Sequence, residues 1–93
     1  MTTGQRSATE RVVSFLLAFS RRSARNGQDP AEFELPMTRA DIGDFLGLTI
    51  ETVSRTFTKL KTLGLIELPQ SNRVKLIDID ELESLADGED QEG

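Results

Sequence analysis

Apolar residues recur at helical spacing along the first part of the chain, from Thr9 to Arg25. We expect Thr9 to cap this helix and Asn26-Gly27 to end it. The apolar side chains form two neighbouring stripes, the first made of Val12, Phe15, Leu16 and Phe19 and the second of Val13 and Leu17. A helix on the surface of a domain needs only one stripe. Either this helix lies deep in its own core, or the second stripe faces a partner chain or a further domain.

A short strand and a second, shorter helix are predicted next. Residues 33–35 are expected to form the strand, which Pro36 stops. Thr38 can cap a helix over residues 39–46. Asp41, three positions later, gives a weak version of the capping box, in which each of two side chains accepts a hydrogen bond from the backbone N–H of the other residue.

A third helix begins almost immediately after the second. Gly47 breaks the preceding helix, Thr49 caps the new one, and residues 50–63 continue it as far as Gly64. Its apolar residues point inward, with Ile50 at the flank: Val53, Phe57, Leu60 and Leu63. Its opposite face is polar: Glu51, Ser54, Arg55, Thr58, Lys59 and Thr62. Any amphipathic surface helix would show this division, so the division alone predicts no function.

The last part of the chain changes to the pattern of strands and then returns to a helical one. Residues 65–68 and 74–77 predict two strands joined by a hairpin loop at 69–73. Asp80 is expected to cap a short final helix, with Leu82 pointing inward.

This order of elements predicts an α+β fold, a winged helix-turn-helix with a leading helix, a two-stranded wing and a short C-terminal helix. The domain is expected to span residues 9–86. Residues 1–8 are expected to be a disordered N-terminus and residues 87–93 an acidic tail.

The formal net charge of −5 looks unfavourable for contact with nucleic acid, but the charges are unevenly distributed. Residues 78–93 contain eight acidic residues and no basic one, whereas residues 1–77 contain the other eight acids and all eleven bases. The body of the chain therefore has a net charge of +3. Because the local field governs contact with a polyanion, the mildly basic body is compatible with DNA binding.

Whole residue types are missing from the chain. With no cysteine and no histidine, it has no disulfide, thiolate metal site, thiol nucleophile or imidazole catalyst. It also lacks a glycine-rich phosphate loop and a clustered carboxylate pair, so neither an enzyme nor a bound cofactor is predicted. No secretory signal is present, and the apolar run Val12 to Phe19 is far shorter than the roughly 20 residues of a membrane span. A cytoplasmic protein without a membrane segment is expected.

Glu51 and Arg55 lie four residues apart near the start of the third helix. Glutamate four residues before arginine is the favourable order for an ordinary surface ion pair, which is the common meaning of such a pair. The position, however, is that of the second helix of a helix-turn-helix, whose N-terminal end enters the DNA major groove. There an arginine donates two hydrogen bonds to guanine, and a glutamate accepts one from cytosine. Glu51, Ser54 and Arg55 are therefore the predicted base-reading residues, Ser54 being small enough to admit a base edge.

Hydroxyl and basic side chains around this face are candidates for contacts to the DNA backbone: Thr38, Arg39, Thr49, Thr52, Lys59 and Arg73. Backbone amides at the start of the third helix would assist them. A plain helix cap is at least as good an interpretation of any single threonine. Arg73 and Lys75 in the hairpin could form a wing that reaches a neighbouring phosphate. A solvated loop is an equally good interpretation of these two residues.

These residues resemble the catabolite activator/FNR family of bacterial transcription regulators. The resemblance covers roughly residues 9–85 and rests on these positions: Ile42-Gly43, Gly47, Glu51-Thr52-Val53, Arg55, Leu60 and Leu65-Ile66. Glu51, Ser54 and Arg55 are similar to the Glu-x-x-Ser-Arg signature of the FNR/FixK branch. The cyclic-AMP branch has glycine in place of Ser54 and arginine in place of Ile50. Thr56 departs from the pattern, because a larger apolar residue is usual there.

The resemblance implies a homodimer that binds a pseudo-palindrome of the form TTGAT-N4-ATCAA in double-stranded DNA. Carried over to this sequence, Arg55 would read the guanine, Glu51 the opposite cytosine or a neighbouring base, and Ser54 would lie near a thymine. The loop Gln28–Glu32 matches the region where family members contact RNA polymerase.

Full family members also have an N-terminal effector-sensing β-barrel and a long dimerisation helix, for which 93 residues leave no room. A fragment of a longer protein is therefore expected, and a stand-alone short protein is the other interpretation. The alternative function is a protein-interaction module built on a winged helix, with little DNA affinity. The acidic total charge and the two-striped first helix would favour that alternative.

Overall fold

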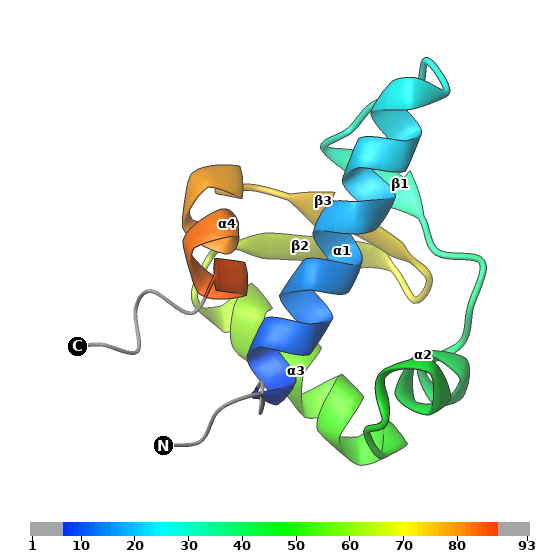
Figure 1. The fold of residues 1–93 in the computed structure, drawn as a ribbon, viewed down its shortest axis with the longest axis vertical. Coiled ribbons are helices and arrows are strands. Elements are labelled where there is room, and N and C mark those ends of the chain that lie inside the picture. The colour runs from blue at the N-terminus through cyan, green and yellow to red at the C-terminus, as the bar shows by residue number, and fades with distance from the viewer. Residues whose placement is uncertain (1–6, 88–93) are drawn as a thin grey trace.

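The computed structural model describes residues 7–87, which form four helices and a three-stranded antiparallel sheet (Figure 1). The helices are α1 (Ala8–Arg25), α2 (Arg39–Leu46), α3 (Ile50–Thr62) and α4 (Ile79–Asp87). The strands are β1 (Glu32–Glu34), β2 (Ile66–Gln70) and β3 (Arg73–Leu76), in the sheet order β1-β3-β2. The predicted winged helix-turn-helix is confirmed. Its two-stranded wing is part of a larger sheet, because β1 pairs with β3.

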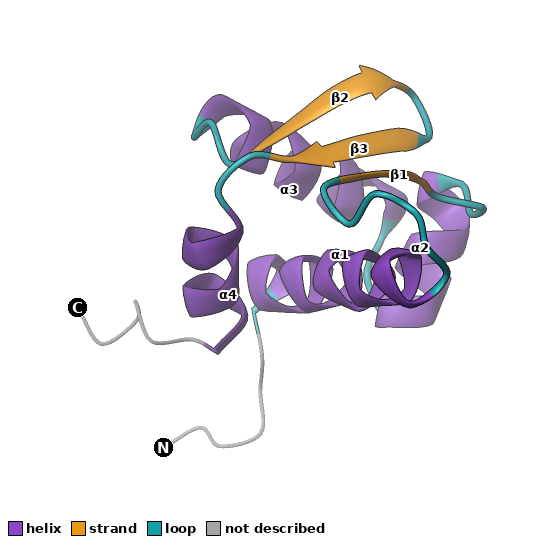
Figure 2. Ribbon diagram, turned by 90° about the horizontal axis from the view of Figure 1, so that it is seen from above, coloured by secondary structure: helices purple, strands orange, loops and turns teal. Residues whose placement is uncertain are grey.

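One apolar core joins the two sides of the molecule. Figure 2 shows the sheet on one side and α1 with α4 on the other. Every helix and strand contributes a buried apolar side chain to this core, among them Leu16 of α1, Phe33 of β1, Ile42 of α2, Phe57 of α3, Ile66 of β2, Val74 of β3 and Leu82 of α4. Burial of this apolar surface is the main force that holds the elements together.

Both apolar stripes of α1 pack into this core, with Phe19 only partly buried at its edge. Val12 and Leu16 of the first stripe and Val13 of the second have no exposed area, and Leu17 is 4% exposed. Helix α4 packs against α1 and adds Leu82 to the core. The hypothesis that the second stripe faces a partner chain is therefore wrong, and α1 lies deep in the core of its own domain.

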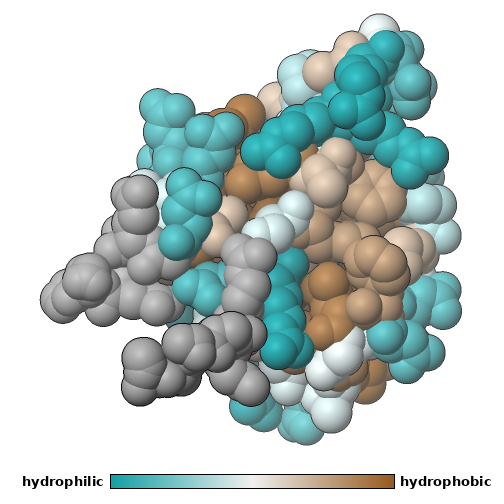
Figure 3. Space-filling model, in the orientation of Figure 1, coloured by the Kyte–Doolittle hydropathy of each residue, from teal (hydrophilic) through white to brown (hydrophobic). Residues whose placement is uncertain are grey.

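A smaller apolar area remains on the surface between α1 and α2. Phe45 of α2 is 69% exposed, and its ring centroid lies 5.8 Å from that of Phe15 in α1. Phe15, Ala18, Phe19, Met37 and Phe45 also line a surface pocket of about 330 Å³. The apolar side chains gathered beside α1 are visible in Figure 3. This area is the surface that the structure leaves to the protein-interaction alternative.

The start of α1 corrects the predicted cap. The hydroxyl of Ser7 accepts a hydrogen bond from the backbone N–H of Glu10 at 3.1 Å, and Glu10 Oε1 accepts one from the backbone N–H of Ser7 at 2.9 Å. These two bonds are the capping box, formed here by a serine and a glutamate three positions apart. Thr9 is inside the first turn of α1 and does not cap it. Of the predicted disordered N-terminus, residues 1–6 lie outside the described residues, and Ala8 is helical.

The start of α4 is corrected in the same way. Asp78 rather than Asp80 caps the helix, because Asp78 Oδ1 accepts a hydrogen bond from the backbone N–H of Glu81 at 3.1 Å. Asp80 lies in the first turn, where a carboxylate is favourable beside the positive end of the helix dipole. The helix continues to Asp87, and the rest of the predicted acidic tail, 88–93, lies outside the described residues.

The strands are displaced by one or two residues from their predicted bounds. Strand β2 runs through Pro69, which the prediction placed in the loop, so that the turn to β3 contains only Ser71 and Asn72. The pairing of β2 with β3 shifts register between Glu67 and Gln70. Proline is tolerated here because β2 pairs only with β3, and an edge strand loses no ladder partner on its free side.

Candidate DNA interface

Two glycines set the position of α3 relative to α2. Gly47 has a φ of +75°, the left-handed conformation that glycine adopts without strain, and it ends α2 as predicted. Gly43 lies inside α2, where an added Cβ would stand 2.6 Å from the backbone oxygen of Leu48. The N–H of Leu48 donates to the carbonyl of Gly43 at 2.8 Å. The short turn therefore requires a residue without a side chain at position 43.

Arg11 of α1 holds the same turn from outside. Its Nη1 donates a hydrogen bond to the carbonyl oxygen of Leu46 at 3.1 Å, at the C-terminal end of α2. A cation there satisfies a terminal carbonyl and opposes the negative end of the helix dipole. Sequence reasoning missed this role, because the two residues are 35 positions apart and no local pattern connects them.

Helix α3 separates a buried face from an exposed face. Val53, Phe57 and Leu60 are at most 1% exposed, as predicted. Leu63, predicted to point inward, is 58% exposed because α3 ends at Thr62. Thr56, which departs from the family pattern, is buried, and its hydroxyl donates to the carbonyl of Thr52 at 2.8 Å. The polar atom at that position is thus satisfied within the helix.

The three predicted base-reading residues lie together on the exposed face. Arg55 Nη2 and Glu51 Oε2 form an ion pair at 3.1 Å, although the side chains are 73% and 75% exposed. Ser54 is exposed as well. An ion pair this exposed contributes little to folding. Both groups are therefore accessible to another partner, while each restrains the orientation of the other.

An apolar residue that the sequence placed at the flank joins this face. Ile50 is the first residue of α3 and is 54% exposed. An exposed aliphatic side chain at this end of the helix suits the methyl group of thymine. The signal that would have found it is its position beside Glu51, at the helix end that the sequence predicted to enter the groove.

Most of the predicted backbone-contact residues lie at helix starts. Thr38 Oγ1 accepts from the N–H of Asp41, and Thr49 Oγ1 accepts from the N–H of Thr52, each at 3.1 Å. Thr38 and Thr49 are therefore helix caps, and Thr49 Oγ1 also donates to Thr52 Oγ1 at 2.9 Å. Free amides at helix starts favour anions such as phosphate. Lys59 is exposed further along α3.

Arg39, the first residue of α2, is held differently. Its guanidinium carbon lies 4.2 Å from the centroid of the Phe57 ring. The side chain is partly buried, and this burial lowers the pKa of Arg39 below its ordinary value. A guanidinium titrates so far above neutral pH that Arg39 keeps its charge.

Arg73 lies in β3 rather than in a loop. Its Nε donates to Glu32 Oε2 at 2.9 Å, and the two side chains are 38% and 32% exposed. Beside this pair, Asn72 Nδ2 donates to Glu34 Oε2 at 3.1 Å. The wing is thereby fastened to β1, and Arg73 takes part in that link.

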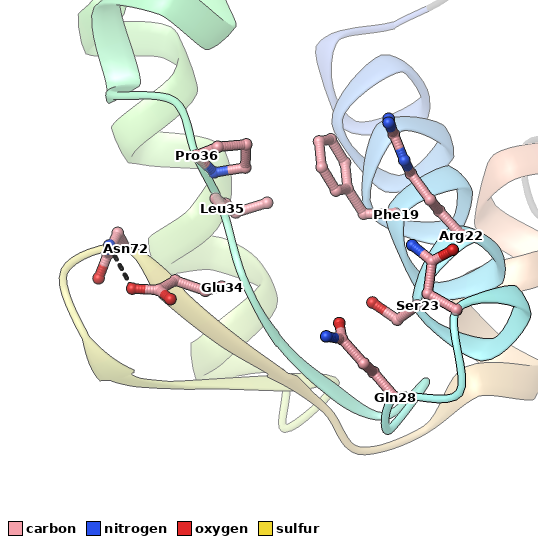
Figure 4. A pocket seen from close by; sticks show the side chains of 9 residues that line it. Phe19, Arg22, Ser23, Gln28, Glu34, Leu35, Pro36 and Asn72 are labelled. Carbon is pink, nitrogen blue, oxygen red and sulfur yellow. Dashed lines mark hydrogen bonds between the residues drawn. The ribbon is translucent and has the colours of Figure 1, made fainter.

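The loop Gln28–Glu32 lies near the C-terminal end of α1. The hydroxyl of Ser20 donates to the carbonyl of Pro30 at 2.7 Å and fixes the loop to α1. Beside the loop, a pocket of about 340 Å³ is lined by Phe19, Arg22, Ser23, Asn26, Gln28, Glu34, Leu35, Pro36 and Asn72 (Figure 4). None of the predicted DNA contacts lines this pocket. The loop and the pocket therefore form a surface separate from the exposed face of α3.

The sequence of this chain matches a known family. Residues 10–85 match the Crp-like helix-turn-helix domain. The nitrogen fixation regulation protein FixK of Azorhizobium caulinodans is 57% identical over 76 residues, which are 81% of this chain and 31% of FixK. The fumarate and nitrate reduction regulatory protein of Salmonella typhimurium is 40% identical over 82 residues, which are 88% of this chain and 31% of that protein.

Solved structures of proteins from the same family have a similar fold. FixK2 from Bradyrhizobium japonicum superimposes with a TM-score of 0.79 and 40% identity, over 88% of this chain and 39% of FixK2. The catabolite activator protein of Thermus thermophilus superimposes with a TM-score of 0.66 and 27% identity, over 87% of this chain and 34% of that protein. This chain thus spans roughly a third of the length of its relatives.

The relatives are transcription regulators, which confirms the prediction that this chain is not an enzyme. Within residues 7–87, no helix has the length and apolar character needed to cross a membrane. The family match extends over most of the chain and includes the whole α2–turn–α3 unit. The chain therefore belongs to the Crp-like helix-turn-helix family, as a DNA-binding domain of a Crp/FNR-type transcription regulator.

Proposed function

We propose that this domain reads a specific DNA sequence by placing the N-terminal end of α3 in the major groove. The observation that supports this most is the exposed ion pair of Glu51 and Arg55 at the capped start of α3, with Ser54 beside it. Arg55 reads a guanine through two hydrogen bonds, and Glu51 accepts one from a cytosine amino group. Ser54 and Ile50 lie close to thymine methyl groups.

The half-site is proposed to resemble TTGAT, in a pseudo-palindrome TTGAT-N4-ATCAA that a homodimer of the full-length regulator occupies. The similarity of Glu51, Ser54 and Arg55 to the signature of the FNR/FixK branch supports this choice. A module of this size covers about 600–1,000 Å² on DNA. High affinity therefore needs two such modules on the two half-sites.

The DNA backbone is held by Thr38 and Arg39 at the start of α2, by Thr49, Thr52 and Lys59 of α3, and by Arg73 of the wing. The hydroxyl oxygens of Thr38 and Thr49 already accept from backbone amides as caps. Thr38 keeps its hydroxyl proton for a phosphate oxygen, whereas Thr49 donates its proton to Thr52, whose own proton then serves that contact. Arg73 donates to Glu32 through Nε, which leaves its terminal Nη groups for a phosphate. The wing then contacts DNA without leaving the sheet.

The loop Gln28–Glu32 is proposed to contact RNA polymerase, so that the regulator acts as an activator in the cytoplasm. Two features support this surface. The loop is fixed to α1 through Ser20 and Pro30. None of the residues assigned to DNA lines the pocket beside the loop, and the loop meets them at its end, where Glu32 pairs with Arg73.

A binding titration tests the proposed readout. A duplex containing TTGAT-N4-ATCAA and a duplex of scrambled sequence are titrated with the 93-residue chain at several salt concentrations. Binding to both duplexes should weaken as salt rises, because phosphate contacts release counterions. The TTGAT duplex should bind more tightly at every salt concentration. Equal binding of the two duplexes at all salt concentrations would reject specific readout.

The protein-interaction alternative loses its main motive, because the second apolar stripe of α1 is buried. The remaining support for this alternative is the smaller apolar surface around Phe45. Under that alternative, neither duplex binds even at low salt, so the same titration separates the two functions.

A further inference from the structure

The contact between Arg39 and Phe57 joins the start of α2 to the middle of α3. Phe57 is 1% exposed, so its ring is held in the core, and the guanidinium of Arg39 lies over that ring. A cation above the face of an aromatic ring is attracted by the electron density of that ring, and the attraction is stronger where water is partly excluded. Arg39 is partly buried and meets this condition.

The absence of an acid beside Arg39 matters for its charge. Both Glu–Arg ion pairs within residues 7–87 involve other arginines, Arg55 and Arg73. A carboxylate would have balanced the charge of the guanidinium and occupied one or two of its N–H donors, whereas a ring face occupies none of them. The contact with Phe57 therefore restrains Arg39 and leaves both its full charge and its donors for a ligand.

Arg39 is also accessible from the surface. It lines a hollow of about 350 Å³ between the start of α2 and the wing turn, together with Leu35, Pro36, Met37, Thr38, Ser71 and Asn72. The same residue thus rests on the core at one side and borders open space at the other.

We infer that Phe57 is a positioning residue for DNA binding, because its ring holds the guanidinium of Arg39 in place for a backbone phosphate without neutralising it. This inference rests on the proposed function, in which Arg39 contacts the DNA backbone. An arginine that is already ordered loses less conformational entropy when the phosphate arrives. Since the ring belongs to α3, the phosphate contact at α2 also fixes how α3 sits in the groove.

A double-mutant cycle tests the inference. The four proteins are the unchanged chain, Phe57→Met, Arg39→Ala and the double variant, each titrated with the TTGAT and the scrambled duplex at one salt concentration. Methionine keeps an apolar side chain and removes the ring. Phe57→Met should weaken binding to both duplexes by about three- to ten-fold, the cost of ordering one flexible side chain on binding. Arg39→Ala should weaken it at least as much, and the double variant should bind no more weakly than Arg39→Ala alone.

Phe33→Met is the matched control. Phe33 is also a core phenylalanine, and it is 5% exposed. Within residues 7–87, the arginine that lies over an aromatic ring is on Phe57 and not on Phe33. Phe33→Met should lower the melting temperature in the way that Phe57→Met does, yet leave the DNA affinity of the folded protein unchanged. Thermal unfolding of each variant gives the folded fraction used to correct the titrations.

Three results would overturn the inference. If Arg39→Ala weakens binding and Phe57→Met does not, the ring has no positioning role, and the proposed function stands. If Phe57→Met weakens binding by the same factor whether or not Arg39→Ala is present, the loss comes from repacking of α3. If Arg39→Ala itself has no effect, the proposed backbone contact fails together with the inference.

A measurement on the unchanged chain covers the case in which Phe57→Met does not fold. The ring current of Phe57 should shift the side-chain proton resonances of Arg39 upfield in the free protein. Arg39 resonances at their ordinary positions would show that the guanidinium does not rest on the ring, and would overturn the inference without any variant.

Discussion

Two glutamate–arginine ion pairs lie within residues 7–87, and their surroundings differ. Glu51 and Arg55 pair along one helix with about three quarters of each side chain exposed. Glu32 and Arg73 pair across two strands with about a third of each exposed. The first pair joins residues four apart and the second joins residues 41 apart.

The difference in exposure separates two uses of the same chemistry. The pair on α3 contributes little to folding because water competes for both groups, and so both are free to exchange partners. The pair in the sheet links two strands that are distant in sequence, and it is screened less by solvent. From this comparison we expect changes on α3 to alter DNA recognition and changes in the sheet to alter stability.

The largest effect is expected from a change in the turn that places α3. In Gly43→Ala, the new Cβ would meet the backbone oxygen of Leu48 at 2.6 Å, so the backbone must move. We expect a loss of about 3 kcal/mol in the free energy of unfolding, at the upper end for overpacking. Specific binding should fall as well. Urea unfolding and the duplex titration measure the two effects.

Gly64→Ala is the control for the turn. Gly64 has a φ of +78°, but no atom lies within 4 Å of an added Cβ. It should strain the end of α3 by about 1 kcal/mol and leave duplex discrimination intact. Equal losses of discrimination in the two variants would show that the close approach at Gly43 is not what places α3.

Removing the guanidinium of the exposed pair should alter DNA recognition and leave stability almost unchanged. Arg55→Ala should cost about 2 kcal/mol of binding to the TTGAT duplex and much less to the scrambled one. The melting temperature should hardly change, since the side chain is 73% exposed. A similar loss on both duplexes would make Arg55 a phosphate anchor rather than a base reader.

Removing the carboxylate of the same pair should have a smaller effect on binding, and the effect should have opposite signs for the two duplexes. In Glu51→Gln, the bond from the cytosine amino group goes to a neutral amide oxygen and is weaker than the bond to a carboxylate, while the scrambled duplex gains because a repelling charge is gone. The free energy that separates the two duplexes should shrink by about 1 kcal/mol. Dissociation constants for both duplexes check this, and an unchanged ratio would limit Glu51 to orienting Arg55.

The smallest expected effect belongs to the pair in the sheet. Arg73→Ala should lower the free energy of unfolding by about 0.5–1 kcal/mol, because a cross-strand link between β3 and β1 is lost. Binding to both duplexes should weaken evenly through the lost phosphate contact, so that discrimination is kept. A change in discrimination would contradict the assignment of this pair to the support of the domain.

Local sequence patterns were sufficient to predict the helices and the turn. Thr38, Gly47 and Thr49 act within a few residues of their own positions, and the structure places them as the spacing indicates. The predicted base-reading residues also meet on one exposed face, because helical periodicity alone brings Glu51 and Arg55 together. That these residues read DNA stays a prediction.

Features that depend on distant residues could not be predicted in this way. The pairing of β1 with β3, the ion pair of Arg73 and the contact from Arg11 to Leu46 all join segments far apart in sequence. The incorrect caps at Thr9 and Asp80 have another cause. Ser7 and Asp78 are also good capping residues a short distance upstream, and the neighbouring side chains decide between them.

The proline in β2 has a consequence for molecules at high concentration. The two outer strands of a sheet are the places where a second molecule can add a strand and begin a fibril. Here β1 has only three residues, and β2 contains Pro69 at an irregular stretch of its pairing with β3. Growth of the sheet from one molecule to the next is therefore hindered on both sides, and the chain should resist fibril formation in concentrated samples.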